Sequence, residues 1–138
     1  MRARLALVLA TCCVLGWQGQ AEAAPQASRC TATITRFAFS PATAAEGSNV
    51  TLALQVQNCT RRTQNLALTR FGTEPPGCPV IDPITTGVAI KPHATYTQST
   101  PMTAPPCKGT ERISEHVSKA GILLAQAEAD LQITAAVH

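Results

Sequence analysis

Four cysteines in the body of the chain are the first residues whose chemistry needs an assignment. The 138-residue sequence holds six cysteines, and those beyond the N-terminal segment are Cys30, Cys59, Cys78 and Cys107. Cysteine serves as a metal ligand, as a thiolate nucleophile or as half of a disulfide. None of these four shows the CxxC spacing, and no histidine lies near one in sequence, which argues against a zinc site. An even number in a small domain that carries an export signal favours two disulfides.

The histidines and one serine are the remaining candidates for chemistry. A copper or zinc site could combine Met102 with the three histidines, His93, His116 and His138, but they are dispersed along the chain. Solvated histidines are the simpler interpretation. Ser114 and His116 would share one face of a strand, yet acyl transfer also needs an orienting group and an oxyanion hole, for which the sequence offers no candidate. We therefore expect no catalytic residue, no metal site and no cofactor.

The N-terminus predicts a secretory signal peptide. Arg2 and Arg4 precede an apolar run from Leu5 to Leu15, and Ala21-Glu22-Ala23 supplies the small-x-small cleavage pattern. The apolar run is shorter than the roughly 20 residues that a membrane-spanning helix needs. Cys12 ends a stretch that looks like a lipobox, but Thr11 fits poorly before it. We expect a secreted, extracellular protein without a membrane span, rather than a cell-surface lipoprotein.

The rest of the chain is expected to form one domain. The predicted organisation is a signal peptide at 1–23, a disordered N-terminal tail at 24–29 and the domain at 30–138. Removal of the signal peptide leaves nine basic and seven acidic residues, a net charge of +2. This bias is too small to argue for a nucleic-acid or anionic-lipid partner.

Short alternating runs separated by Pro, Gly and Asn predict an all-β sandwich of about seven strands. In Asn49–Asn58, apolar and polar side chains alternate over eight residues, which is typical of a half-buried strand. Between Cys30 and Pro41 the alternation breaks, and a bulge or a bend near Arg36 would restore it. Asn58 is expected to close its strand in a turn, although Asn58-Cys59-Thr60 also matches the glycosylation sequon.

The C-terminal part supports two interpretations. Residues 123–134 alternate as a long strand, but apolar residues between Ile113 and Leu131 also recur at helical spacing. Gly121 would weaken a helix at its middle by about 1 kcal/mol. We favour two strands that turn at 118–121, with an amphipathic helix as the alternative.

The stretch FSPATAAEGSNVTLALQVQN resembles the opening of secreted bacterial immunoglobulin-like domains, such as the cell-adhesion-related domain of bacteria. GILLAQAEADLQI is similar to the last strand of these domains. The resemblance implies a seven-stranded immunoglobulin-like sandwich with a binding or spacer role and no catalytic residues to carry over. The cysteines are not general to that family.

An immunoglobulin-like strand order also predicts the disulfide pairing. In that order Cys30 and Cys59 lie at one end of the sandwich, and Cys78 and Cys107 lie at the other. A disulfide joins Cα atoms only about 6 Å apart, so we predict Cys30–Cys59 and Cys78–Cys107. Each bridge would stabilise the fold by roughly 3–4 kcal/mol on the chain-entropy model.

Two proline-rich segments, 74–83 and 100–109, would then be tied at one end. The simpler interpretation is that these segments cap the sandwich. Prolines and a disulfide also make rigid, exposed loops that are suited to recognition. Glu74 and Asp82 flank the first segment as two isolated carboxylates. The predicted recognition residues are Pro76, Pro79, Val80, Ile81, Pro105 and Pro106.

Three functional classes follow. The first is a secreted non-catalytic module for extracellular binding, adhesion or cell-surface support, with an unknown extracellular protein or cell-surface component as its partner. The second is a serine protease inhibitor, because Cys78-Pro79-Val80-Ile81-Asp82-Pro83 resembles the reactive loop of the Streptomyces subtilisin inhibitor family. Val80 would then enter the primary pocket of a secreted protease, although the loop is shorter and the remaining chain does not match. The third is a small-molecule carrier, which would need a cleft between the sheets.

Overall fold

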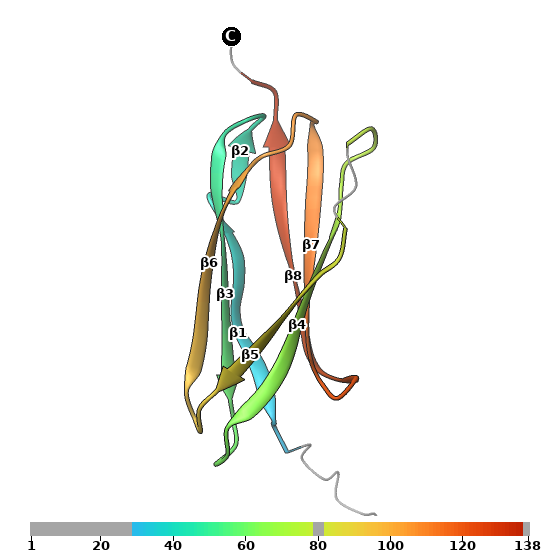
Figure 1. The fold of residues 1–138 in the computed structure, drawn as a ribbon. Helices are drawn as coiled ribbons and strands as arrows, with labels where there is room; N and C mark the ends of the chain where they lie inside the picture. The colour runs from blue at the N-terminus through green and yellow to red at the C-terminus, as the bar shows by residue number, and fades with distance from the viewer. Residues whose placement is uncertain (1–28, 79–81, 137–138) are drawn as a thin grey trace, which may run out of the picture.

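The protein folds as eight β-strands in a computed structural model that describes residues 29–78 and 82–136 (Figure 1). The strands are β1 (Ala32–Ser40), β2 (Thr43–Ala45), β3 (Asn49–Asn58), β4 (Gln64–Thr73), β5 (Ile84–Ile90), β6 (Thr95–Thr103), β7 (Gly109–Lys119) and β8 (Ile122–Thr134). Within the described ranges no helix is long and apolar enough to cross a membrane. The predicted signal peptide and most of the predicted N-terminal tail lie outside the described residues.

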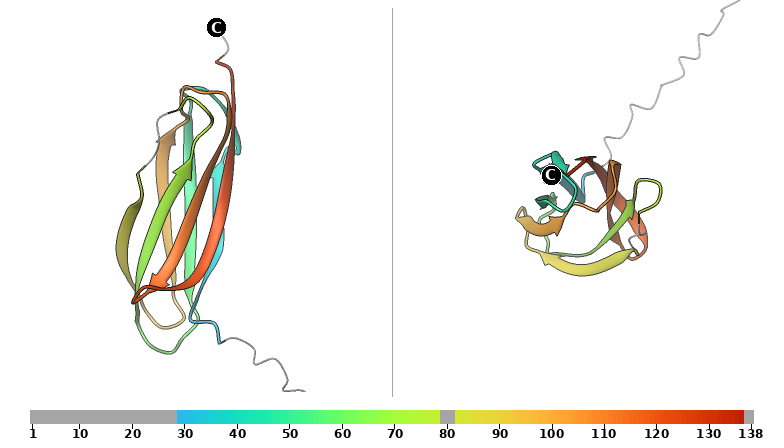
Figure 2. Two further views of the ribbon diagram at one scale, coloured as in Figure 1. Left: turned by 90° about the vertical axis from the view of Figure 1, so that its right-hand side faces the viewer. Right: turned by 90° about the horizontal axis from the view of Figure 1, so that it is seen from above.

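The strands form two packed sheets, as the sequence predicted. One sheet has the order β1-β3-β6, and the other has the order β2-β8-β7-β4-β5. Figure 2 shows the resulting elongated sandwich from the side and along its long axis. The fold is therefore an immunoglobulin-like sandwich with two disulfides. The prediction of about seven strands missed only β2, which pairs in parallel with β8 over three residues.

The first strand contains an irregularity where a bulge or a bend was predicted, and it is a shift of register. β1 pairs with β3 in antiparallel register, and the register shifts between Ile34 and Arg36. Thr35 is thereby left without a partner on β3. Because of this extra residue, Ile34 on one side of the shift and Phe37 and Phe39 on the other side all pack against the core. On β3 the apolar side chains are buried as the alternation predicted, and the most deeply buried are Leu52, Leu54 and Val56.

The C-terminal segment is a pair of strands, so the helix alternative is wrong. β7 and β8 form a hairpin in which Lys119 pairs with Ile122. The two residues of the turn, Ala120 and Gly121, have φ values of 49° and 80°. Two consecutive positive φ values are typical of the two-residue turns whose twist matches antiparallel strands. A glycine that weakens a helix thus favours this hairpin.

The core between the sheets consists of two adjoining clusters. Phe39, Val50, Leu52, Ile113, Leu131 and Ile133 lie in the cluster nearer the proline-rich segments. Leu54, Val56, Leu66, Leu68, Ile90 and Val117 lie in the other cluster. Full burial of an aliphatic side chain contributes about 1.5–3 kcal/mol, so these side chains supply the main force that holds the sheets together.

Both predicted disulfides are present. Cys30 bonds to Cys59 and Cys78 bonds to Cys107, each with a sequence separation of 29. β4 lies between Cys59 and Cys78 in the chain, so the two disulfides sit at opposite ends of the sandwich (Figure 1).

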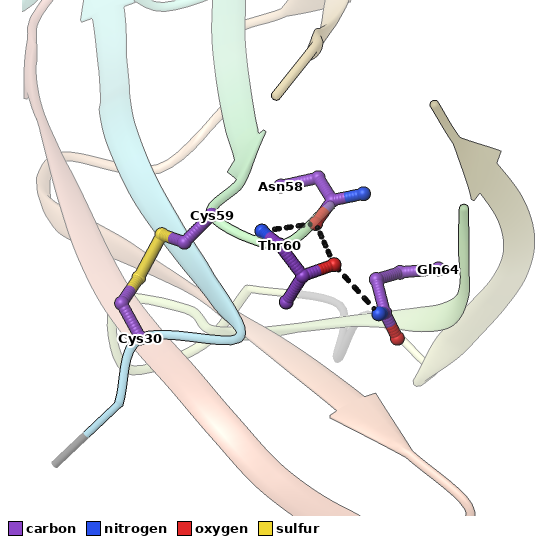
Figure 3. The surroundings of a disulfide bond; sticks show 5 residues. All are labelled: Cys30, Asn58, Cys59, Thr60 and Gln64. Atoms are coloured by element: carbon purple, nitrogen blue, oxygen red, sulfur yellow. Dashed lines mark hydrogen bonds between the residues drawn. A yellow bond between two sulfur atoms is a disulfide. The ribbon is translucent and has the colours of Figure 1, made fainter. Parts of the chain in front are cut away.

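Asn58 organises the end of the sandwich that carries the first disulfide (Figure 3). Its Oδ1 accepts hydrogen bonds from the backbone nitrogen and the hydroxyl of Thr60, both at 2.8 Å. Its Nδ2 donates to the carbonyl oxygens of Arg62, Ile90 and Lys91 at 2.8–3.0 Å. Asn58 is fully buried, so the predicted turn role is confirmed. The amide nitrogen that glycosylation would modify is enclosed in the folded domain.

Candidate functional site

The proline-rich end is the part of the molecule that the sequence singled out for recognition. We use this name for the described residues 74–78 and 100–109, which the Cys78–Cys107 disulfide joins. Pro76 and Pro106 are exposed, and Pro105 is half-buried. Pro79, Val80 and Ile81 lie outside the described residues. A shallow hollow of about 330 Å³ runs along residues 72–78.

Pro75 anchors this end to β7. Pro75 is buried, unlike the adjacent Pro76, and it lies against Gly109 at the start of β7. A Cβ atom on Gly109 would come within 3.0 Å of the Pro75 Cβ, and Gly109 has a φ of 135°, which side chains disfavour. The N–H of Cys78 donates to the Pro75 carbonyl at 3.1 Å and closes a turn. Glycine is therefore required where the proline segment meets the strand.

Two glutamates face each other where the proline-rich end meets β7. β4 and β7 pair as far as Thr73 and Arg112, so the next cross-strand position brings Glu74 opposite Glu111. Glu111 is 1% exposed and shares the inward parity of Ile113. The Oε2 atoms of both glutamates are buried without a hydrogen-bond partner. We call these two residues the carboxyl pair.

Burial controls the protonation of the carboxyl pair. Loss of solvent, together with the charge of Glu74 and a hydrogen bond to it, raises the pKa of Glu111 to about 7. Burial also raises the pKa of Glu74, although the hydrogen bond to Glu111 opposes this. Two ionised carboxylates have only acceptor oxygens, so a hydrogen bond between them requires a proton on one of them.

A second buried acid is neutralised by an arginine instead. Arg70 on β4 donates from Nε to Glu115 Oε2 at 2.8 Å, and Glu115 is 1% exposed. Arg70 also donates to the Thr100 hydroxyl at 3.3 Å and lies 6.0 Å from the centre of the Phe37 ring. Thr100 and Phe37 belong to the three-stranded sheet, so Arg70 connects the two layers.

A small pocket opens beside Arg70, between the edge strands β5 and β6. Its volume is about 190 Å³, and it is lined by Leu68, Arg70, Ile84, Thr86, Gln98, Thr100 and Glu115. Ligand pockets usually enclose roughly 300–1,000 Å³. This space can admit one side chain or a very small molecule, but it does not provide the cleft that a small-molecule carrier would need.

The candidate metal ligands that the structure describes, His93, Met102 and His116, do not come together. His116 lies on the outer face of β7, where its ring meets Phe71 edge to face at 4.7 Å between centroids. His93 occupies the turn before β6, whereas Met102 lies near the far end of that strand. His138 is outside the described residues. Among the residues that are described, no three His, Cys, Asp or Glu side chains cluster closely enough to hold a metal ion.

Sequence reasoning missed the carboxyl pair. The sequence indicates Glu74 and Asp82 only as two isolated carboxylates, of which Asp82 is exposed, and it indicates no role for Glu111. One signal was available, because Glu111, Ile113, Glu115 and Val117 alternate with polar residues and are all buried. An acid that shares the parity of buried aliphatic residues in a strand needs a partner across the sheet.

Comparison with known proteins supports the fold. No protein-family model matches the sequence, and no curated protein matches it. Among solved structures, the CARDB domain of a Pyrococcus furiosus protein, in complex with di-metal ions, aligns with a TM-score of 0.55 and 13% identity over 75% of this chain and 86% of that one. The predicted similarity to cell-adhesion-related immunoglobulin-like domains is thus confirmed at the level of the fold.

Larger proteins contain similar domains. The alkylpurine DNA glycosylase AlkC of Pseudomonas fluorescens matches with a TM-score of 0.57 and 13% identity, over 78% of this chain and 32% of AlkC. A putative β-galactosidase of Bacteroides fragilis matches with a TM-score of 0.57 and 10% identity, over 74% of this chain and 17% of the enzyme. This chain therefore spans a third or less of the length of these two proteins and corresponds to one domain of each.

Proposed function

We propose that this protein is a secreted, non-catalytic immunoglobulin-like module that binds an extracellular protein or a cell-surface component through its proline-rich end. The observation that carries this proposal is the Cys78–Cys107 disulfide, which joins two proline-rich segments at one end of the sandwich. Disulfides of this kind persist in oxidising compartments, in agreement with the predicted signal peptide.

The proline-rich end is suited to recognition because little of its freedom remains to be lost on binding. Pro76 and Pro106 are exposed, and each closely precedes one cysteine of the disulfide. Pro75 fixes the first segment on Gly109. Ordering of loops and side chains opposes association, so a surface that is rigid before binding retains more of its contact energy.

A cell-binding measurement tests this proposal. The exported chain, with both disulfides formed, would be labelled and titrated onto intact cells of the source organism. We expect saturable binding that falls at least tenfold in the double variant Pro76→Glu/Pro106→Glu, because buried carboxylates oppose contact. Pro92→Glu is the matched control, since Pro92 is an exposed proline in the β5–β6 turn at the opposite end. Equal binding by both variants, or no binding by the parent, would contradict the proposal.

A protease inhibitor is the second candidate. It is favoured by the disulfide at Cys78, which immediately precedes the segment with Val80, as bracing of a reactive loop requires. In this case the protein should inhibit subtilisin or elastase stoichiometrically, and Val80→Asp should abolish inhibition. Full protease activity at micromolar excess of the protein would exclude this function.

A further inference from the structure

Among the residues that the structure describes, no basic side chain forms an ion pair with the carboxyl pair. Glu111 lies opposite Leu131 of β8, with Glu74 across from it at the end of β4. On the surrounding elements, Arg70 is paired with Glu115 and Arg112 is paired with Asp130. Lys108, before β7, is exposed, and Glu46, in the β2–β3 turn, is partly exposed. The buried oxygens of the pair therefore depend on each other.

A single proton shared by Glu74 and Glu111 removes the repulsion between their two carboxylates. Two like charges opposite each other in adjacent strands are destabilising, and burial makes the repulsion stronger. When one carboxyl group is protonated, its O–H can donate to the other, and the pair carries one negative charge instead of two. Two carboxyl groups that share a site titrate as a unit, and the second ionisation is displaced upward.

We infer that the carboxyl pair is a proton-dependent latch: one shared proton joins Glu74 to Glu111 and holds residues 74–78 against β7, and release of that proton to solvent frees this segment. Cys78 stays bonded to Cys107, so the free segment remains tethered at one end while Pro75 leaves Gly109. This inference stands without the proposed binding role, because it concerns only the packing of the described residues.

The expected pH dependence has a definite sign. The folded state holds the shared proton more tightly than the unfolded chain, in which glutamates have a pKa near 4.3. Folding stability from the latch is therefore complete below about pH 4 and declines as the pH rises toward 7, where Glu111 loses its proton. Release of one proton changes the unfolding equilibrium by at most about tenfold per pH unit.

Denaturation at several pH values tests the linkage. For the parent protein, we expect the unfolding equilibrium constant to rise severalfold per pH unit between pH 5 and 7. Glu111→Gln replaces the protonated acid by a neutral amide that donates to Glu74, so this dependence should be largely lost. Glu128→Gln is the control, because Glu128 is an exposed acid that contacts Arg112 at 3.7 Å, and it should keep the parental dependence.

A nuclear Overhauser measurement tests the release itself. Pro75 lies in contact with Gly109, so cross-peaks between their protons report whether the segment is closed. We expect these cross-peaks at pH 5 and their loss at pH 8 in the parent, and their persistence at both pH values in Glu111→Gln.

Three results would overturn the inference. Cross-peaks that persist at pH 8 in the parent would show that the segment does not open. A dependence on pH that is the same in the parent and in Glu111→Gln would assign the proton to another group. Restoration of the closed segment at pH 8 by Ca²⁺, reversed by a chelator, would identify the pair as a cation site instead of a latch.

Discussion

Arg70 and Glu115 form an ion pair of 2.8 Å inside the sandwich, whereas two inward positions further along the same strands two acids, Glu74 and Glu111, face each other. The two cross-strand pairs occupy the same interlayer space but neutralise their charge differently. In the first pair the guanidinium of Arg70 supplies the positive charge opposite the buried carboxylate. The second pair depends on a proton, so the packing of the proline-rich end against β7 should change with pH.

Removal of the cation from the Arg70 pair should be strongly destabilising. In Arg70→Met, Glu115 would remain 1% exposed without a partner, and loss of one member of a buried ion pair typically lowers the free energy of unfolding by about 3–5 kcal/mol. Urea denaturation at pH 7.5 measures this change. Arg112→Met is the control, since its bonds to Asp130 lie on the surface and should contribute little. Similar losses in the two variants would show that burial of Glu115 does not matter.

Asn58→Asp should destabilise the end of the sandwich that carries the Cys30–Cys59 disulfide. The substitution keeps the acceptor for Thr60 but places a carboxylate oxygen against the carbonyls of Ile90 and Lys91. We expect a loss of about 3 kcal/mol or more at neutral pH, and a smaller loss at pH 4, where the acid can donate a hydrogen bond. Thermal unfolding at both pH values checks this. Asn65→Asp, on the exposed face of β4, should stay within about 0.5 kcal/mol of the parent.

Gly109→Ala should loosen the proline-rich end without a change in charge. Its Cβ would approach the Pro75 Cβ within 3.0 Å, and its φ of 135° disfavours a side chain, so we expect a loss of about 3 kcal/mol or more. Gly47→Ala provides the comparison, because φ is 75° there but no atom lies within 4 Å. Gly47→Ala should lower the free energy of unfolding by only about 1–2 kcal/mol. If chemical denaturation gave the same loss of stability for both variants, Pro75 would have to move aside at no cost, which would contradict this prediction.

The two disulfides should contribute equally to the stability of the fold but unequally to binding. Both close a sequence separation of 29, so the chain-entropy model predicts a loss of about 3–4 kcal/mol for either double Cys→Ser variant. Under conditions where both variants remain folded, binding to intact cells should be weakened only by Cys78→Ser/Cys107→Ser. Greater weakening by Cys30→Ser/Cys59→Ser would place the binding surface at the other end.

Much of the fold could be predicted from the sequence because its cues are local. The alternation of Asn49–Asn58, an irregularity of the first strand near Arg36, and the disulfide pairing were all confirmed. The C-terminal alternation matched strand and helix patterns alike, and the turn at Ala120 and Gly121 distinguishes them. β2 was missed because three residues are too few to show a period, and because it pairs with β8, almost 90 residues away in the sequence.

The site was harder to predict because its parts meet only through strand register. The proline segments and their disulfide could be identified from composition and cysteine position. The pairing of Glu74 with Glu111 depends on how β4 aligns with β7, and no local pattern encodes that alignment. The same holds for Arg70, whose partners come from three other strands in two sheets.

The most direct measurement of the shared proton is the side-chain carboxyl carbon shift of Glu111, followed by NMR from pH 3 to pH 9. Burial and the neighbouring acid raise its pKa to about 7, so we predict a midpoint near that value. In Glu74→Gln the like charge is removed, and the midpoint should move down by at least one pH unit. A parental midpoint between pH 4 and 5, unchanged in Glu74→Gln, would contradict a proton shared by the carboxyl pair.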